Sequence, residues 1–190
     1  MTLPLTPPQT IGPFFHRALL DDALHDLTAK ETIGQRIVIE GLVLDGDGNP
    51  VGDAMLEIWQ ANAAGRYDHP DDPERQPIDT HFHGFGRCAT DRAGCFRFVT
   101  IKPGPVRETG DFAHAPHINV NVFARGLLHH LVTRIYFPGE ALNATDPVLT
   151  CVPESRRATL VARDSRSSTQ SHYRFDIILQ GENETVFFEV

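Results

Sequence analysis

The sequence predicts an all-β protein, a single β-sandwich with an N-terminal arm and a few short helices. Short apolar runs recur along the 190 residues, and 14 prolines and 15 glycines lie between them. Alternating runs separated by turn residues are typical of strands in a sandwich. Helical periodicity is confined to residues 16–28, where leucines follow the spacing of one amphipathic helix. We therefore expect an arm over residues 1–35 and a sandwich over residues 36–190.

The strands are expected at defined positions along the chain. Residues 36–44 are rich in β-branched side chains, and residues 45–50 follow with the glycines and asparagine of a tight reversal. Residues 95–101 and 117–124 alternate apolar with polar positions, as half-buried strands do. Trp59, the only tryptophan, is expected to pack in the core rather than against a ligand. The remaining expected strands cover residues 54–60, 131–137, 159–163, 173–179 and 185–190.

Composition limits the classes of partner. With 17 basic and 25 acidic residues the formal net charge is −8, which argues against binding to nucleic acid or to an anionic membrane. We expect small molecules or proteins as partners. No segment has the pattern of a secretory leader or a membrane span, so a soluble cytoplasmic protein is expected. The three cysteines, Cys88, Cys95 and Cys151, form no C-x-x-C pair and are expected as buried free thiols.

Ten histidines invite the hypothesis of a metalloprotein. His81 and His83 form an H-x-H pair, but they fall in a long polar segment, residues 69–87, without a third ligand nearby. We expect both to be solvated, and we expect that segment to be functional or to form an interface. His129 and His130 are adjacent, so on a strand they would face opposite sides and would not share a metal.

The chain lacks a phosphate-binding glycine loop, a nucleophile elbow and a zincin helix. Three segments stand out instead: LEIWQANAAGRYDHP (56–70), TIKPGPV (100–106) and APHINVNVFARGLLHHLVTRIYFPGE (115–140). Together with QTIGPF (9–14) and YRFDIILQGENETVFFEV (173–190), they resemble the intradiol ring-cleaving dioxygenases over nearly the whole chain. Within that family the chain is similar to the α subunit of the two-subunit members.

The resemblance implies a non-haem Fe(III) held by two tyrosines and two histidines, which activates a catechol for attack by O₂. The four ligand positions correspond here to Tyr67, Val106, His117 and Asn119. Val106 has no lone pair, and the Asn119 amide is a weak neutral ligand that does not replace imidazole. We therefore expect this chain to bind no metal and to carry no catalytic residue. Tyr67 and His117 are then expected as hydrogen-bonded core residues.

The resemblance also implies where the chain contributes to catalysis. Fe(III) would be bound by a homologous β subunit, and repeated αβ units would form a higher oligomer. With O₂, the complex would cleave protocatechuate between its hydroxyl-bearing carbons, giving 3-carboxy-cis,cis-muconate. The arm would pack on the partner, and Thr10, Gly12 and Pro13 would line its substrate cavity. Arg125 is expected to attract the substrate carboxylate, the alternative being an ion pair with an acid of the β subunit.

Two other functions stay open on the sequence alone. One is a self-sufficient dioxygenase with an altered iron site, which iron analysis and the colour of the isolated chain would distinguish. The other is a β-sandwich binding or carrier module, because sandwiches support many unrelated functions. Such a module would be stable alone, whereas an obligate subunit would need its partner.

Overall fold

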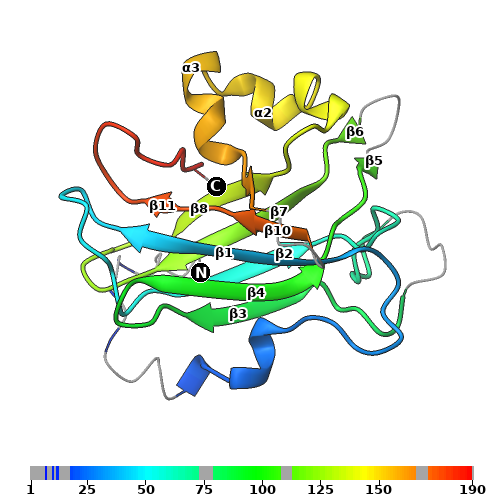
Figure 1. The fold of residues 1–190 in the computed structure, drawn as a ribbon, viewed down its shortest axis with the longest axis horizontal. Helices are drawn as coiled ribbons and strands as arrows, with labels where there is room; N and C mark the ends of the chain where they lie inside the picture. The colour runs from blue at the N-terminus through cyan, green and yellow to red at the C-terminus, as the bar shows by residue number, and fades with distance from the viewer. Residues whose placement is uncertain are drawn as a thin grey trace, which may run out of the picture.

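Two β-sheets lie face to face in the computed structural model, which describes residues 7, 10, 12, 18–72, 79–107, 113–165 and 171–189 (Figure 1). The first sheet contains β1 (Arg36–Leu44), β4 (Cys95–Ile101), β9 (Arg163–Asp164), β10 (Ser171–Arg174) and β11 (Ile177–Ile178). The second contains β2 (Met55–Gln60), β3 (Phe85–Ala89), β7 (His117–Phe123) and β8 (Leu131–Tyr136). The smaller described elements are the pair β5 (Val106–Arg107) and β6 (Ala113–His114), the helices α2 (Pro147–Cys151) and α3 (Glu154–Arg157), and the 3-10 turns η1 (Asp22–His25), η2 (Ala141–Ala144) and η3 (Ala158–Leu160). The predicted all-β sandwich with short helices is confirmed.

The first sheet is organised around β1. This strand pairs antiparallel with β4 along its length and parallel with β10 and then β11. Between β10 and β11 the carboxylate of Asp176 accepts the backbone N–H of Leu42 at 3.0 Å, in place of a ladder bond. A Cβ on Gly41 would lie 1.7 Å from the carbonyl oxygen of Phe175, so the chain crosses here only because residue 41 has no side chain.

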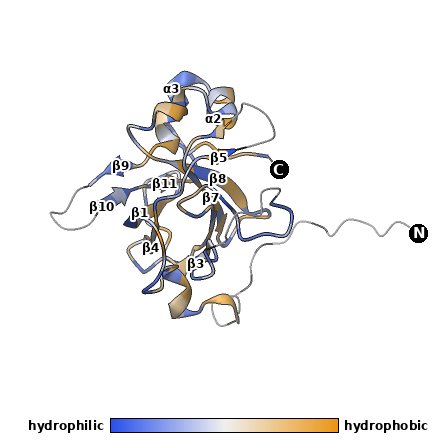
Figure 2. Cartoon of the chain, turned by 90° about the vertical axis from the view of Figure 1, so that its right-hand side faces the viewer, coloured by the Kyte–Doolittle hydropathy of each residue, from blue (hydrophilic) through white to orange (hydrophobic). Residues whose placement is uncertain are grey.

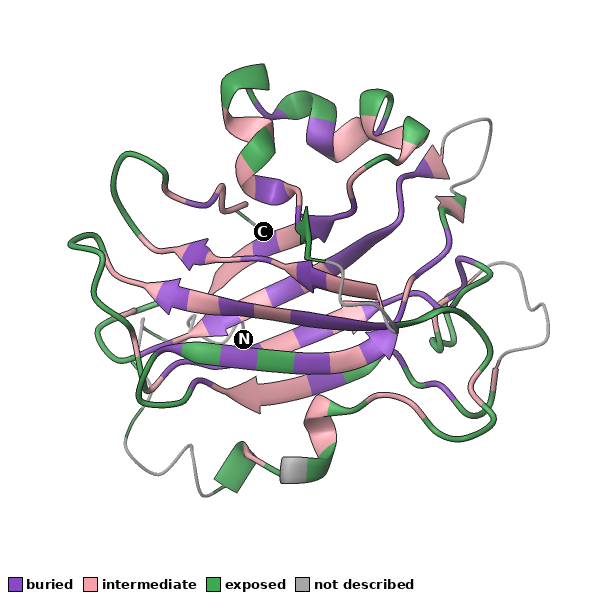
Figure 3. Ribbon diagram, in the orientation of Figure 1, coloured by how far each residue is buried: buried purple, intermediate pink, exposed green. Residues whose placement is uncertain are grey.

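The second sheet is wholly antiparallel, in the order β3-β2-β7-β8. The hydrophobic core lies between the two sheets, and Figure 2 shows hydrophobic residues gathered there. Alternate residues of β7, namely Ile118, Val120 and Val122, belong to this core and are at most 1% exposed. Figure 3 shows the same alternation of buried and exposed positions along β4. Residues 117, 119 and 121 therefore face away from the core.

A second, smaller hydrophobic cluster covers part of the outer face of the second sheet. Tyr136 of β8 and Ala115 pack there against Leu149, Val152 and Leu160, which belong to α2, η3 and the segment between them. The helices sit together above the sandwich in Figure 1. This layer closes one end of the outer face.

Several predicted elements are confirmed, and several are wrong. Strands at residues 36–44 and 95–101 form with the expected bounds, and Asp45 caps the expected reversal by accepting the N–H groups of Asp47 and Asn49. The expected strand at 159–163 begins in the turn η3 and reaches strand structure only at Arg163 of β9, apart from an isolated bridge at Val161. Of 185–190, the described residues 185–189 contribute only an isolated bridge between Phe188 and Val132. The expected strand at 173–179 is divided into β10 and β11 by Asp176.

The other differences concern loops and cysteines. Of the expected helix at 16–28, residues 18 and 19 are α-helical, residues 22–25 form the 3-10 turn η1, and residues 16 and 17 lie outside the described part. The polar segment 69–87 ends inside strand β3, and residues 73–78 are outside the description. All three cysteines are free, but Cys88 is half-buried and Cys95 and Cys151 are exposed, so the expectation of buried thiols is wrong. No helix among the described residues is long and apolar enough to cross a membrane.

Candidate functional site

The four positions that the resemblance assigns to metal ligands come together at one end of the outer face of the second sheet. His117 and Asn119 lie on β7 and face away from the core. Trp59 of β2 is the cross-strand partner of Asn119, and Tyr136 of β8 is that of His117. We call Tyr67, Val106, His117 and Asn119 the pseudo-site.

Tyr67 is positioned by the turn that follows β2. Gly65 adopts φ +77°, and a Cβ there would lie 1.9 Å from the carbonyl oxygen of Pro105, so this turn requires glycine. The backbone N–H of Tyr67 donates to Asp72 at 2.9 Å, and Asp72 also pairs with the buried Arg66. The turn is therefore fixed by the left-handed backbone conformation of Gly65 and by the ion pair of Asp72 with Arg66.

Trp59 stacks on Tyr67 with ring centroids 5.8 Å apart and ring planes inclined by 15°. The expectation that Trp59 packs in the core is wrong, because it is only half-buried and lies on the outer face. Both rings line a cavity of about 370 Å³, together with Val106 of β5 and Arg107. The pseudo-site thus has two stacked aromatic rings along one side.

His117 is 3% exposed and is held by the backbone. Its Nδ1 lies 2.8 Å from the carbonyl oxygen of Ala115, so Nδ1 carries the proton and Nε2 faces the Tyr67 hydroxyl at 3.5 Å. Burial, and then the charge of Arg134, lower the pKa of His117 to about 4. Burial raises the pKa of Tyr67, and Arg134 and Asn119 partly oppose that effect. Both rings are neutral at pH 7.

The donor set does not fit a ferric ion. Val106 brings only a branched hydrocarbon to the pseudo-site, and Asn119 brings a neutral amide, so one imidazole and one neutral phenol remain. A stable Fe(III) centre of this kind needs anionic phenolate oxygens to offset its charge. Within the described ranges no three His, Cys, Asp or Glu side chains are grouped as a metal site.

A buried network next to the pseudo-site was not predicted from the sequence. Asp146 is fully buried and accepts hydrogen bonds from the N–H groups of Ala115 and Leu149, both at 2.8 Å, and from the Tyr136 hydroxyl at 2.9 Å. Burial alone would raise the pKa of Asp146, but the Leu149 and Ala115 bonds outweigh it and lower the pKa. The Asp146-Pro147 pair, an N-cap followed by proline at the first turn of α2, was the available signal.

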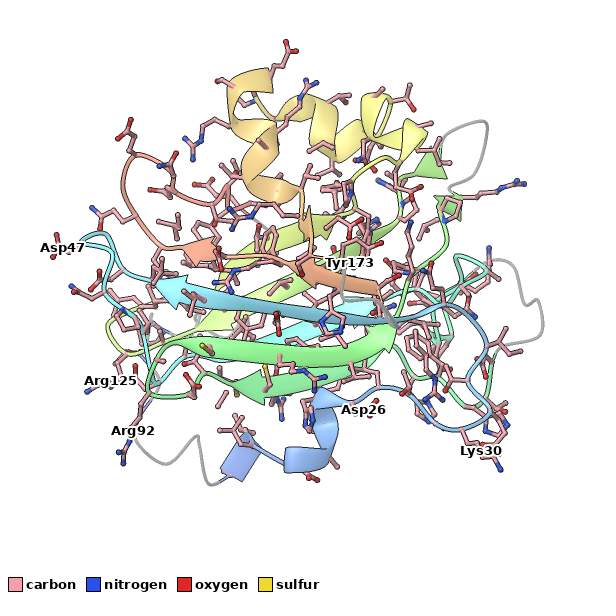
Figure 4. All side chains as sticks on the ribbon, viewed as in Figure 1. Asp26, Lys30, Asp47, Arg92, Arg125 and Tyr173 are labelled. Atoms are coloured by element: carbon pink, nitrogen blue, oxygen red, sulfur yellow. The ribbon has the colours of Figure 1, made fainter. Side chains whose placement is uncertain are left out.

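Arg125 lies at the opposite end of the sandwich. It follows β7, eight residues after His117, and Figure 4 labels it on the left of the view with Arg92, whereas β5 lies on the right in Figure 1. Its side chain is 78% exposed and forms an ion pair with Asp53. The structure therefore does not bring Arg125 to this chain's own pseudo-site.

Thr10 lies beside Arg125, because its hydroxyl accepts the N–H of Gly126 at 3.0 Å. A Cβ added to Gly12 would have no atom within 4 Å, so this chain's own packing does not require a glycine there. Pro13 lies outside the described residues. Two of the three expected arm residues are therefore described, and one of them contacts the backbone next to Arg125.

The two histidine pairs that stand out in the sequence lie on the surface. His81 and His83 are exposed, as expected, and Nδ1 of His83 lies 2.9 Å from Asp68. His129 and His130 are also exposed, and the ring of His130 stacks on Phe123 at 5.3 Å between centroids.

Comparison with known proteins agrees with this geometry. A family model described as Dioxygenase matches residues 10–181. The chain is 45% identical over 202 residues to the protocatechuate 3,4-dioxygenase alpha chain of Burkholderia cepacia, covering 100% of this chain and 99% of that one. It is 43% identical over 172 residues to the beta chain from the same organism, covering 85% of this chain and 73% of that one.

Solved structures share the fold. The dioxygenase domain of a dioxygenase and carbohydrate-binding protein fusion from Streptomyces sp. SirexAA-E matches with TM-score 0.64 and 27% identity, over 83% of this chain and 88% of that one. The intradiol ring-cleavage dioxygenase from Tetranychus urticae matches with TM-score 0.64 and 20% identity, over 84% and 88%. Because the family model spans most of the sequence and the full-length relatives exceed 40% identity, the chain belongs to the intradiol dioxygenase family.

Proposed function

We propose that this chain is the iron-free α-type subunit of a two-chain dioxygenase that cleaves protocatechuate with O₂ to 3-carboxy-cis,cis-muconate. The observation that supports this most strongly is the pseudo-site, in which Val106 and Asn119 replace two ligands in an otherwise intact family fold. The full-length likeness to chains named as alpha chains, and the likeness to a beta chain, support a paired assembly. The Fe(III) and the catalytic residues then belong to the β-type partner.

Thr10, Gly12, Pro13 and Arg125 are the residues we assign to the substrate side of the shared pocket. Arg125 is turned to solvent at the end of the sandwich remote from this chain's pseudo-site, and Thr10 contacts the neighbouring Gly126. A residue so placed reaches a pocket only across a subunit contact. Its guanidinium matches the geometry of a carboxylate such as that of protocatechuate.

The chain supplies binding and enclosure rather than bond-making in this proposal. Ferric iron, when bound by the partner, supplies the Lewis acidity that activates the catecholate for reaction with O₂. The arm residues form a rigid wall, and Arg125 orients the ring by its carboxylate and offsets the overall acidity of this chain. Cytoplasmic location and a higher αβ oligomer complete the proposal.

Co-expression with a β-type chain tests the proposal. We expect the isolated chain to be colourless, free of iron and inactive, and the complex to contain one iron per αβ pair and to form 3-carboxy-cis,cis-muconate from protocatechuate. A ferric, reddish isolated chain that cleaves protocatechuate would instead establish a self-sufficient enzyme. A monomer that is stable and does not associate with the β-type chain would favour the carrier module.

A further inference from the structure

Arg134 is the one basic side chain that β8 directs toward the pseudo-site. It is the cross-strand partner of Asn119, and it lies two residues before Tyr136, which pairs with His117. Because alternate residues of a strand share a face, Arg134 and Tyr136 both face away from the core, whereas Ile135 between them belongs to it. The guanidinium is therefore on the same face as the pseudo-site, near enough for its charge to act on both His117 and Tyr67.

This guanidinium is fixed by a chain of hydrogen bonds. Arg134 donates to the hydroxyl of Tyr136, which donates in turn to Oδ1 of Asp146 at 2.9 Å. Asp146 is fully buried and accepts the backbone N–H groups of Ala115, Val148 and Leu149, so it holds the Tyr136 hydroxyl in place for Arg134. Nη1 of Arg134 is buried without a hydrogen-bond partner among the described residues. A buried donor without a partner carries a desolvation cost, which is larger for a charged group.

We propose that Arg134 takes the place of the metal ion in this chain, as a permanent internal cation that excludes iron from the pseudo-site independently of the missing ligands. The inference rests on the proposed function, in which this chain holds no iron. Guanidinium does not lose its proton in proteins, so the charge is present at every working pH. A second cation placed between Tyr67 and His117 would be repelled by it. Restoring the two ligands alone would then leave the site unable to hold iron.

The structure offers room for the restored ligands. Val106 lines the cavity of about 370 Å³ beside Tyr67, so a phenol at residue 106 would have space next to the existing one. Asn119 is half-buried and faces the same side as His117, so an imidazole there would complete the H-x-H pair. If a variant with both ligands restored binds no iron, the cause is therefore charge rather than crowding.

The test uses the assembled αβ complex and counts iron per pair, so that the iron of the β-type partner is an internal standard. Four versions of this chain are compared: Val106→Tyr with Asn119→His, and the same pair with Arg134→Gln, with Arg134→Lys or with Arg92→Gln. Arg92 is exposed and distant from the pseudo-site, which makes it the matched control (Figure 4). Iron is measured by atomic absorption after loading, tyrosinate-to-iron charge transfer by visible absorption, and folding by circular dichroism.

We expect iron to rise from one to two per pair only when Arg134→Gln accompanies the restored ligands. Arg134→Lys keeps the charge and Arg92→Gln keeps Arg134, so both should stay at one. Two irons per pair with Arg134 in place would overturn the inference. Equal iron content of the Arg134→Gln and Arg134→Lys variants would also overturn it, as would a folded Arg134→Gln variant that holds only one iron per pair. Two irons per pair in the wild-type complex would contradict the proposed function itself.

Discussion

The hydroxyl of Tyr136 donates a hydrogen bond of 2.9 Å to Oδ1 of Asp146, whose side chain is fully buried. The same carboxylate accepts the N–H groups that begin α2 and the N–H of Ala115, which precedes β7. One side chain thus connects the outer helices to the strand that carries His117. This connection places Asp146 among the residues that matter most for stability.

We predict that Asp146→Ala lowers the free energy of unfolding by about 3 kcal/mol, because several buried donors lose their acceptor. Asp26→Ala is the matched control, since Asp26 is exposed and accepts only local bonds from Thr28. It should cost about 0.5 kcal/mol. Urea unfolding of the full chain measures both, and equal losses for the two variants would contradict the role of Asp146.

Stability should depend on pH through His117. Its pKa is lowered to about 4 by burial and by Arg134, whereas an unfolded histidine titrates near about 6.5. Between these values the unfolded chain binds a proton that the folded chain does not, so stability falls as pH drops through this window. The loss is up to about 3 kcal/mol and is complete below about pH 4.

The measurement compares urea unfolding from pH 7 to pH 4 in the wild type and in His117→Gln. The free energy of unfolding should fall less steeply with decreasing pH in His117→Gln, because the titrating imidazole is gone. His81→Gln, at an exposed position, should retain the wild-type slope. A wild-type slope in His117→Gln would show that other groups cause the acid sensitivity.

Gly65 should not accept a side chain. Its φ of +77° and the 1.9 Å approach of the Pro105 carbonyl oxygen predict that Gly65→Ala destabilises the chain by about 3 kcal/mol and displaces Tyr67. Gly139→Ala is the control, because its φ is +75° but no atom lies within 4 Å of the added Cβ. It should cost about 1 kcal/mol.

Fluorescence provides a local readout for the Gly65 variant. Trp59 is the only tryptophan of the chain and stacks on Tyr67, so movement of Tyr67 should shift or brighten the emission of Gly65→Ala but not of Gly139→Ala. Unchanged emission together with an unchanged melting temperature would rule out the tight turn.

Arg125→Ala tests the substrate-side assignment in the assembled enzyme. We expect KM for protocatechuate to rise by about tenfold or more, because a charge-assisted contact to the carboxylate is lost. Arg92→Ala, an exposed arginine at the same end of the sandwich, should leave KM unchanged (Figure 4). Size-exclusion chromatography checks assembly; loss of assembly with normal KM in the remaining complex would indicate an ion pair with the β subunit instead.

The three cysteines should differ in reactivity toward a thiol reagent such as DTNB. Burial raises the pKa of Cys88 to about 12, so its thiol should react only on unfolding. Cys95 is exposed, but desolvation and the nearby Asp91 raise its pKa, so it should react more slowly than the exposed Cys151. Titration of wild type and Cys→Ser variants assigns each phase, and fast reaction of Cys88 would contradict the packing of β3.

The sequence by itself determined the strands whose alternation is local. Residues 95–101 and 117–123 form strands in which buried positions alternate with less buried ones, and residues 36–44 form a strand that is rich in β-branched side chains. At the ligand positions that the family resemblance implies, the side chains of Val106 and Asn119 predict an incomplete ferric ligand set. These conclusions needed no knowledge of what lies nearby in space.

Contacts between distant segments were decided only by the tertiary structure. Asp176 interrupts a run that reads as one strand, because its carboxylate replaces a backbone acceptor for Leu42, 134 residues earlier. Trp59 is expected in the core from the sequence, yet it faces away from the core residue Ile58, and its partner is Tyr67 in a glycine turn on the outer face. Arg134 acquires its place beside the pseudo-site only through the register of β8 on β7 and the buried Asp146 behind Tyr136. Periodicity specifies which residues share a face, but the electrostatics of a site depend on strand register and on buried counter-charges, which exist only once the chain has folded.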